Sequence, residues 1–107
     1  MNHTYSVESP WTDYKKNKVY HLTTVSIKEL DEPVLTKTGL VGKGMVATIH
    51  GYNGCVFEGH AVCCPMDEFS PLRGAKLALQ RAINECSKMT KEMRTAIWNG
   101  FWATFPV

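Results

Sequence analysis

Two histidines and two cysteines lie close together in the middle of the chain: His50, Cys55, His60 and Cys64. These residue types bind zinc, and a closed zinc site needs four ligands that converge on one point. In the hairpin predicted for residues 44–64, His50, His60 and Cys64 share one face, whereas Cys55 points to the other. The pattern therefore indicates exposed histidines and packed thiols, and we expect no metal and no other cofactor.

Cysteine-based catalysis is the second chemistry that these residues could support, with Cys63 or Cys64 as the nucleophile and His60 beside it. Such a site needs a thiolate, a neighbouring base and a donor to the oxyanion. The spacing of these residues is not diagnostic of such a site, and buried cysteines are common in strands. We therefore expect a non-enzymatic protein without catalytic residues, and a small enzyme is the third-ranked hypothesis.

The strands around these side chains carry the clearest pattern in the sequence. Residues 44–64 read as two strands joined by the turn GYNG. A bulged register that pairs Ile49 with Cys55 places the apolar side chains on one face of the hairpin. A tight Asn53–Gly54 turn is the stronger local signal, but it would mix the two faces. We therefore expect the bulged register.

Two helices are expected in the C-terminal part of the chain. The first begins with Ser70 as its N-cap and Pro71 at its first helical position, and the second begins with Thr90 as its N-cap and ends near Thr104. Apolar residues recur at helical spacing along both segments. They are Leu72, Ala75, Leu79, Ala82, Ile83 and Cys86 in the first helix, and Met93, Ile97, Phe101 and Phe105 in the second.

The N-terminal part of the chain gives weaker signals. Residues 1–17 read as an irregular arm in which Trp11 is anchored against the domain, because an exposed indole is costly. Residues 18–27 are rich in β-branched and aromatic types and read as a strand. Residues 29–40 read as a turn or long loop, in which Val34 and Leu35 could form a short edge strand.

Length and composition restrict the fold and the location. The chain has 107 residues, of which 44% are hydrophobic, which is enough for one core and excludes a disordered tail. No run of about 18 apolar residues exists to span a bilayer, and the first twenty residues hold no apolar signal-peptide core. We therefore expect a cytoplasmic protein with free thiols and no membrane contact. Its single domain, residues 1–107, is expected to be α+β: a small antiparallel sheet of three or four strands packed by two C-terminal helices.

Charge is unevenly distributed along the chain. The net charge of +2 is too small to indicate nucleic-acid binding by itself. Residues 70–107 nevertheless carry six basic and two acidic residues, whereas the first 69 residues have a net charge of −2. A basic C-terminal third suits an acidic partner, and an ordinary solvated helix face explains the same pattern.

Residues 43–85 resemble the later part of a double-stranded-RNA-binding domain, with a hairpin followed by the segment PMDEFSPLRGAKLALQRAI. The resemblance implies that basic residues at the start of a helix contact phosphates. This chain departs from the family in that Asp67 and Glu68 lie where cations are expected. The family's paired lysines and its first helix are missing, and an extra aromatic helix follows. Nucleic-acid binding is therefore the alternative function.

The same stretch also resembles small, uncharacterised accessory proteins of bacteriophages, over about a quarter of the chain. The matching residues are Pro65, Asp67, Phe69, Ser70, Gly74, Ala78, Arg81 and Ala82. The resemblance implies a phage-encoded protein that binds and inhibits or modulates a host protein or nucleoprotein complex in the host cell cytoplasm. It implies no catalytic mechanism.

The aromatic C-terminal helix and the cations near it form the predicted partner-binding surface. Tryptophan and arginine dominate the energetics of protein interfaces. Either the aromatic residues all pack on the sheet, or some of them form a surface for a partner or for a homodimer. The predicted partner-binding residues are Arg73, Lys76, Arg81, Lys88, Lys91, Arg94, Trp98 and Trp102.

Overall fold

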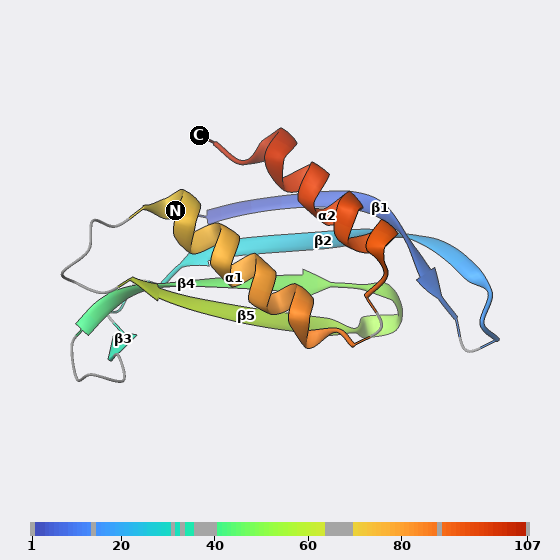
Figure 1. Cartoon of the computed structure of the whole chain (residues 1–107), viewed down its shortest axis with the longest axis horizontal. Helices are drawn as coiled ribbons and strands as arrows, with labels where there is room; N and C mark the ends of the chain where they lie inside the picture. The colour runs from blue at the N-terminus through green and yellow to red at the C-terminus, as the bar shows by residue number, and fades with distance from the viewer. Residues whose placement is uncertain are drawn as a thin grey trace.

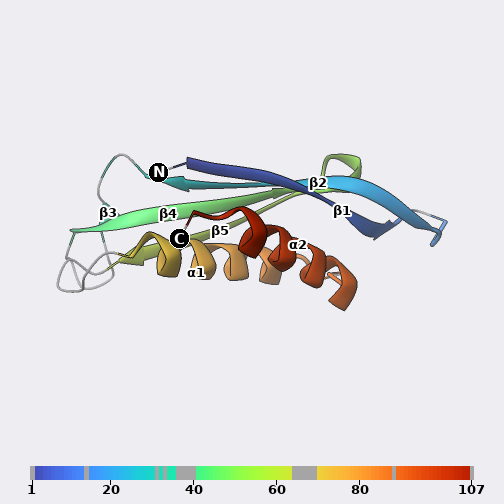
Figure 2. The same cartoon turned by 90° about the horizontal axis from the view of Figure 1, so that it is seen from above.

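The computed structural model shows an α+β fold in which two helices lie on one face of an antiparallel sheet (Figures 1 and 2). It describes residues 2–13, 15–30, 32, 34–35, 41–63, 70–87 and 89–106. The predicted fold class is thereby confirmed. Within the described residues, no helix is both long enough and apolar enough to cross a membrane.

The sheet consists of four long strands, each antiparallel to its neighbours, in the order β1-β2-β4-β5. A fifth strand, β3, has only two residues and pairs with the start of β4. The strands are β1 (Asn2–Thr12), β2 (Lys18–Glu29), β3 (Val34–Leu35), β4 (Val41–His50) and β5 (Val56–Cys63). The short edge strand at Val34 and Leu35 is the alternative that the sequence left open.

Strand β1 corrects the prediction of an irregular arm over residues 1–17. It pairs with β2 along its whole length, from Asn2 opposite Lys28 to Thr12 opposite Lys18. The strand pattern was hidden because one of its inward positions is Ser9, which is fully buried. The Ser9 hydroxyl is satisfied there by the hydroxyl of Thr23 at 2.7 Å, so the buried polar group has its partner.

Trp11 lies in the same strand, and its predicted anchoring is confirmed. Its side chain is only 8% exposed. The indole N–H donates to the Ser9 and Thr23 hydroxyl oxygens, each at 2.9 Å. Strand β1 is therefore held to β2 by a buried side-chain network in addition to its main-chain pairing.

The β4–β5 hairpin keeps the predicted faces in a register shifted by two residues. Ile49 lies opposite Phe57, not opposite Cys55 as predicted. A shift of two residues leaves every side chain on the same face of the sheet. Met45, Ala47, Ile49 and Ala61 accordingly lie in the core.

The turn of this hairpin combines the two alternatives that the sequence offered. Asn53 and Gly54 both adopt positive φ, 59° and 76°, as an Asn-Gly turn requires. The main-chain N–H of Gly51 donates to the carbonyl of Cys55, and that of Cys55 donates to Tyr52. Gly51 and Tyr52 both bond to Cys55, so the turn holds one residue more than a two-residue Asn-Gly turn would. This extra residue keeps the apolar side chains of the hairpin on one face.

The helices are α1 (Pro71–Glu85) and α2 (Lys91–Thr104). Helix α2 runs back along the sheet in the direction opposite to α1 (Figure 1). Both predicted N-caps are confirmed, because Ser70 accepts from the main-chain N–H of Arg73 and Thr90 accepts from that of Met93. Helix α1 covers β4 and β5, and α2 packs on β1. Figure 2 shows that both lie on the same side of the sheet.

Helix α1 approaches the sheet closely over a glycine. A Cβ atom at Gly59 would lie 2.2 Å from the main-chain oxygen of Ala78 and 2.3 Å from the main-chain nitrogen of Ala82. The small residues Ala75, Ala78 and Ala82, which are buried in α1, make this approach possible. Residues that are fully buried between the layers include Val25, Ile27, Ile49, Leu79, Ile97 and Phe101.

Candidate functional site

Seven of the eight predicted partner-binding residues lie on the two helices. Helix α1 carries Arg73, Lys76 and Arg81, and α2 carries Lys91, Arg94, Trp98 and Trp102. All five of these cations are exposed. Lys88 lies outside the described residues.

The two helices are joined by a contact between two of these residues. The Lys76 ammonium lies 5.4 Å from the ring centroid of Trp102. This distance is within the range of a cation–π interaction, which attracts a cation to the face of an indole. Residues 26 positions apart in the chain therefore form one surface feature, which we name the Lys76–Trp102 pair.

Trp102 is the aromatic residue of α2 that reaches solvent. Its side chain is 51% exposed, and its ring meets that of Phe101 edge-on, with centroids 5.1 Å apart. Phe101 itself is fully buried. An exposed indole is thus held in place by a core residue of the same helix, which limits the entropy that it loses on binding.

Trp98 has a different environment. It is half-buried, packs against the core, and meets the Phe101 ring edge-on at a centroid distance of 5.5 Å. Phe105 is also buried and stacks on Phe101 at 4.8 Å. The aromatic residues of α2 and its C-cap therefore divide: Phe101 and the C-cap Phe105 belong to the core, Trp98 borders it, and Trp102 lies on the surface.

Arg81 has a structural contact that the sequence did not suggest. Its Nη1 donates to the main-chain carbonyl of His60 in β5, at 2.6 Å. Strand β5 pairs with β4 alone within the described part of the chain. The Arg81 guanidinium therefore links α1 to the edge strand, and only its remaining donors are available to a partner.

The outward surface of α1 and α2, which we name the helical face, carries mainly cations. Glu92 is engaged at 3.0 Å by Lys18 of β2, and this contact raises the pKa of the Lys18 ammonium through the hydrogen bond and the charge of Glu92. Among the described residues, no carboxylate pairs with Arg73, Lys76, Lys91 or Arg94. The helical face is therefore positive along both helices.

The histidine and cysteine candidates do not converge in the described part of the structure. His60 bonds to the Glu58 carboxylate at 2.6 Å on the face of the sheet that the helices leave open. Cys55 is exposed in the turn before β5, which differs from the packed thiol that we expected. The described residues contain no group of three or more potential metal ligands. Cys64 and the side chain of Cys63 lie outside the described residues.

Two features were not found from the sequence. The open face of the sheet exposes Tyr20 and Leu22 on β2, with 61% and 60% of their side chains accessible. At the end of the sheet where α2 begins, a cavity of about 710 Å³ lies between the β1–β2 turn, the β4–β5 turn and the ends of both helices. Three parts of the chain that are far apart in sequence form this cavity, and one of them includes the end of the unpredicted β1.

No family model, curated protein or solved structure matches the chain. Function is therefore inferred from the geometry of the helical face. That face combines an exposed indole, a lysine over its ring and cations on both helices.

Proposed function

We propose that this chain is a non-enzymatic accessory protein that binds an acidic surface of another protein through α1 and α2 and blocks that surface. The Lys76–Trp102 pair is the observation that supports this function best. It joins a half-exposed indole and a cation from two different helices in one place. Large aromatic side chains next to cations are typical of the centres of protein interfaces.

The surrounding cations have a separate role in the proposed complex. Arg73 on α1 and Arg94 on α2 are exposed and have no carboxylate partner among the described residues. Charge complementarity of this kind accelerates association and disfavours wrong partners more than it increases affinity. In the proposed complex Trp102 supplies contact area, and the cations orient the acidic partner.

The resemblance to bacteriophage accessory proteins suggests the setting. In that setting the partner is a host protein or nucleoprotein complex in the host cytoplasm, and the chain acts by steric exclusion. Steric exclusion requires a stable contact surface and no reacting groups.

Nucleic-acid binding is the second candidate. It is favoured by the exposed Arg73 and Lys76 in the first two turns of α1, because cations at a helix N-terminus are well placed to contact phosphates. Salt separates the two candidates. Each phosphate contact to a duplex steepens the dependence of log affinity on log salt by about 0.9.

The first test is affinity capture from a bacterial lysate with and without nuclease, using the wild type and two matched variants. Trp102→Ala removes the exposed indole of the helical face, and Tyr20→Ala removes an exposed aromatic residue from the opposite face of the sheet. We expect a stoichiometric, nuclease-resistant protein that is captured by the wild type and by Tyr20→Ala but lost with Trp102→Ala. Capture that disappears with nuclease would replace the proposed function by the second candidate. Equal capture by both variants would contradict a role for this surface.

A further inference from the structure

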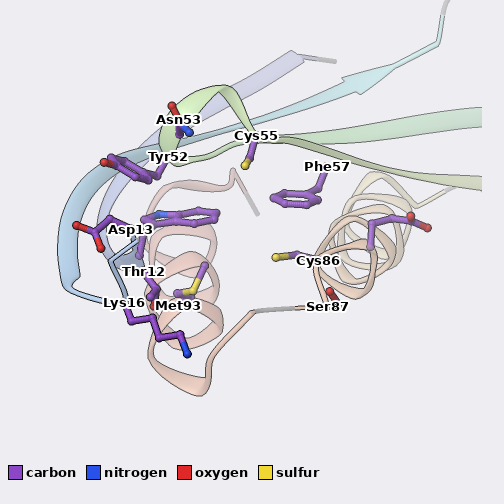
Figure 3. Close-up of a pocket in the computed structure, with 12 residues that line it drawn as sticks. Thr12, Asp13, Lys16, Tyr52, Asn53, Cys55, Phe57, Cys86, Ser87 and Met93 are labelled. Atoms are coloured by element: carbon purple, nitrogen blue, oxygen red, sulfur yellow. The ribbon is translucent and has the colours of Figure 1, made fainter.

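The cavity at the end of the sheet has the size of a ligand site. Its volume of about 710 Å³ lies within the range of about 300–1,000 Å³ that is usual for small-molecule pockets. Trp11 of β1 and Phe57 of β5 line its wall. Figure 3 shows the sulfur atoms of Cys55, Cys86 and Met93 around the same space. Aromatic rings together with sulfur atoms make this wall apolar and polarisable.

Two aromatic rings that line the cavity lie in nearly parallel planes. The Trp11 and Phe57 rings are inclined by only 8°, with centroids 6.5 Å apart. Parallel rings offer aromatic surface against which a planar molecule can stack. Stacking on such a surface selects planar ligands over puckered ones of equal volume.

The Trp11 ring is fixed before any ligand arrives. Its N–H is held by the Ser9 and Thr23 hydroxyls, each at 2.9 Å. On its other side the turn approaches so closely that a Cβ at Gly51 would lie 2.4 Å from the ring. The part of the ring that borders the cavity is therefore held in one position, and preorganisation of this kind favours binding.

The rim of the cavity carries an unusual lysine. Lys16 and Asn53 are the non-glycine residues with positive φ in the described chain, 64° and 59°, and both line this cavity. Asparagine tolerates that conformation, whereas lysine adopts it at an energetic cost, and such costs concentrate at functional sites. In Figure 3 the Lys16 side chain lies on the side of the cavity where Thr12 and Met93 lie.

Two carboxylates also line the cavity. Asp13 accepts the main-chain N–H groups of Lys15 and Asn17 through one oxygen, at 2.9 and 2.8 Å, so its charge is partly used within the turn. Glu85 lies at the last turn of α1 and is exposed. Among the described residues that line the cavity Lys16 is the one cation, so a bound anion would be placed at Lys16 and away from Glu85.

We propose that this cavity binds a planar aromatic carboxylate, with its rings against Trp11 and Phe57 and its acid group at Lys16. The parallel rings account for the aromatic part, and the Lys16 ammonium accounts for the acid. This site lies apart from the Lys76–Trp102 pair and does not depend on the proposed function.

The test uses three probes that differ in one property each. 2-Naphthoate has the rings and the charge, 2-naphthamide has the rings alone, and decahydro-2-naphthoate has the charge on a puckered skeleton. Binding is followed by ¹H–¹⁵N spectra of the three indole N–H groups, with Trp98→Phe and Trp102→Phe assigning two signals and leaving Trp11 as the third. We expect 2-naphthoate to shift the Trp11 signal most, 2-naphthamide to shift it at higher concentration, and the puckered acid to leave it unchanged.

Lys16→Asn tests the acid contact without endangering the fold, because asparagine suits positive φ. We expect the affinity for 2-naphthoate to fall by about two- to fivefold, the range for an exposed ion pair, and that for 2-naphthamide to stay unchanged. Equal loss for both probes would overturn the assigned role of Lys16.

A second pair of variants tests the location of the site. Cys55→Phe fills the cavity from the exposed turn, whereas Val56→Phe places the same ring one residue away, on the open face of the sheet. We expect Cys55→Phe to abolish binding of both naphthyl probes and Val56→Phe to leave it intact. Equal effects of the two variants, or probe shifts confined to Trp98 and Trp102, would overturn the proposal.

Discussion

The close approach of α1 to the sheet predicts a large effect of a single methyl group. In Gly59→Ala the new Cβ would lie 2.2 Å from the Ala78 oxygen and 2.3 Å from the Ala82 nitrogen. Both are main-chain atoms, so no side-chain rotation relieves the clash, and the helix must move away by about 1 Å to restore contact distance. That movement loosens the packing of every buried side chain of α1.

We expect Gly59→Ala to lower the free energy of unfolding by about 3 kcal/mol, at the upper end of the usual cost of overpacking. Urea unfolding measures this change as a lower midpoint with an unchanged slope. The matched control is Gly54→Ala, where a Cβ meets nothing within 4 Å and the cost comes from the positive φ of 76° alone. That control should lose about 1 kcal/mol. A loss below 1 kcal/mol for Gly59→Ala would refute the inference that α1 is held at its present distance by the missing side chain.

Two further predictions concern positions away from the helix–sheet contact. Lys16→Gly should raise the free energy of unfolding by about 1 kcal/mol, because glycine adopts positive φ without strain. The control is Lys15→Gly, at a neighbour without positive φ, which should not raise the free energy of unfolding. Equal effects of the two variants in chemical denaturation would contradict this prediction. Tyr5 donates to the carbonyl of Ile97 at 2.8 Å, and its burial raises the pKa of the phenol above its usual value near 10. The neutral phenol is thus favoured in the folded state, so its stabilisation is complete below pH 10 and is lost as the pH rises beyond it. Tyr5→Phe should lower the free energy of unfolding by about 1 kcal/mol at pH 7. It should also flatten the decline of this free energy between pH 9 and about 11. An unchanged decline would exclude Tyr5 as the source of the pH dependence.

The helices and the central hairpin could be predicted from the sequence because their signals are local. Ser70 and Thr90 cap their helices through contacts to residues three positions away. In β4 and β5 the alternation of apolar and polar residues predicts which side chains face the core, although the predicted strand pairing differs from the observed one by two residues. Strand β1 could not be predicted from apolar alternation, since its buried Ser9 is compatible with the core only because Thr23 and Trp11 bond to it.

The candidate surfaces were predictable in composition and not in arrangement. The sequence indicated cations and tryptophans on two helices. It gave no indication that Lys76 would lie over Trp102, because that contact depends on how α1 and α2 pack on different strands. The cavity beside Trp11 needed β1, both turns and both helices in place, so no short stretch of sequence carries its signal.

The contact between Arg81 and the His60 carbonyl bears on how the protein behaves at high concentration. An open strand edge is a template to which strands of other molecules can add, which leads to aggregation. The guanidinium places a charge against the edge strand β5 and discourages such growth. The helix that presents cations to a partner thus also protects the β5 edge of the sheet, so loss of Arg81 should appear as turbidity in concentrated samples well before it appears as unfolding.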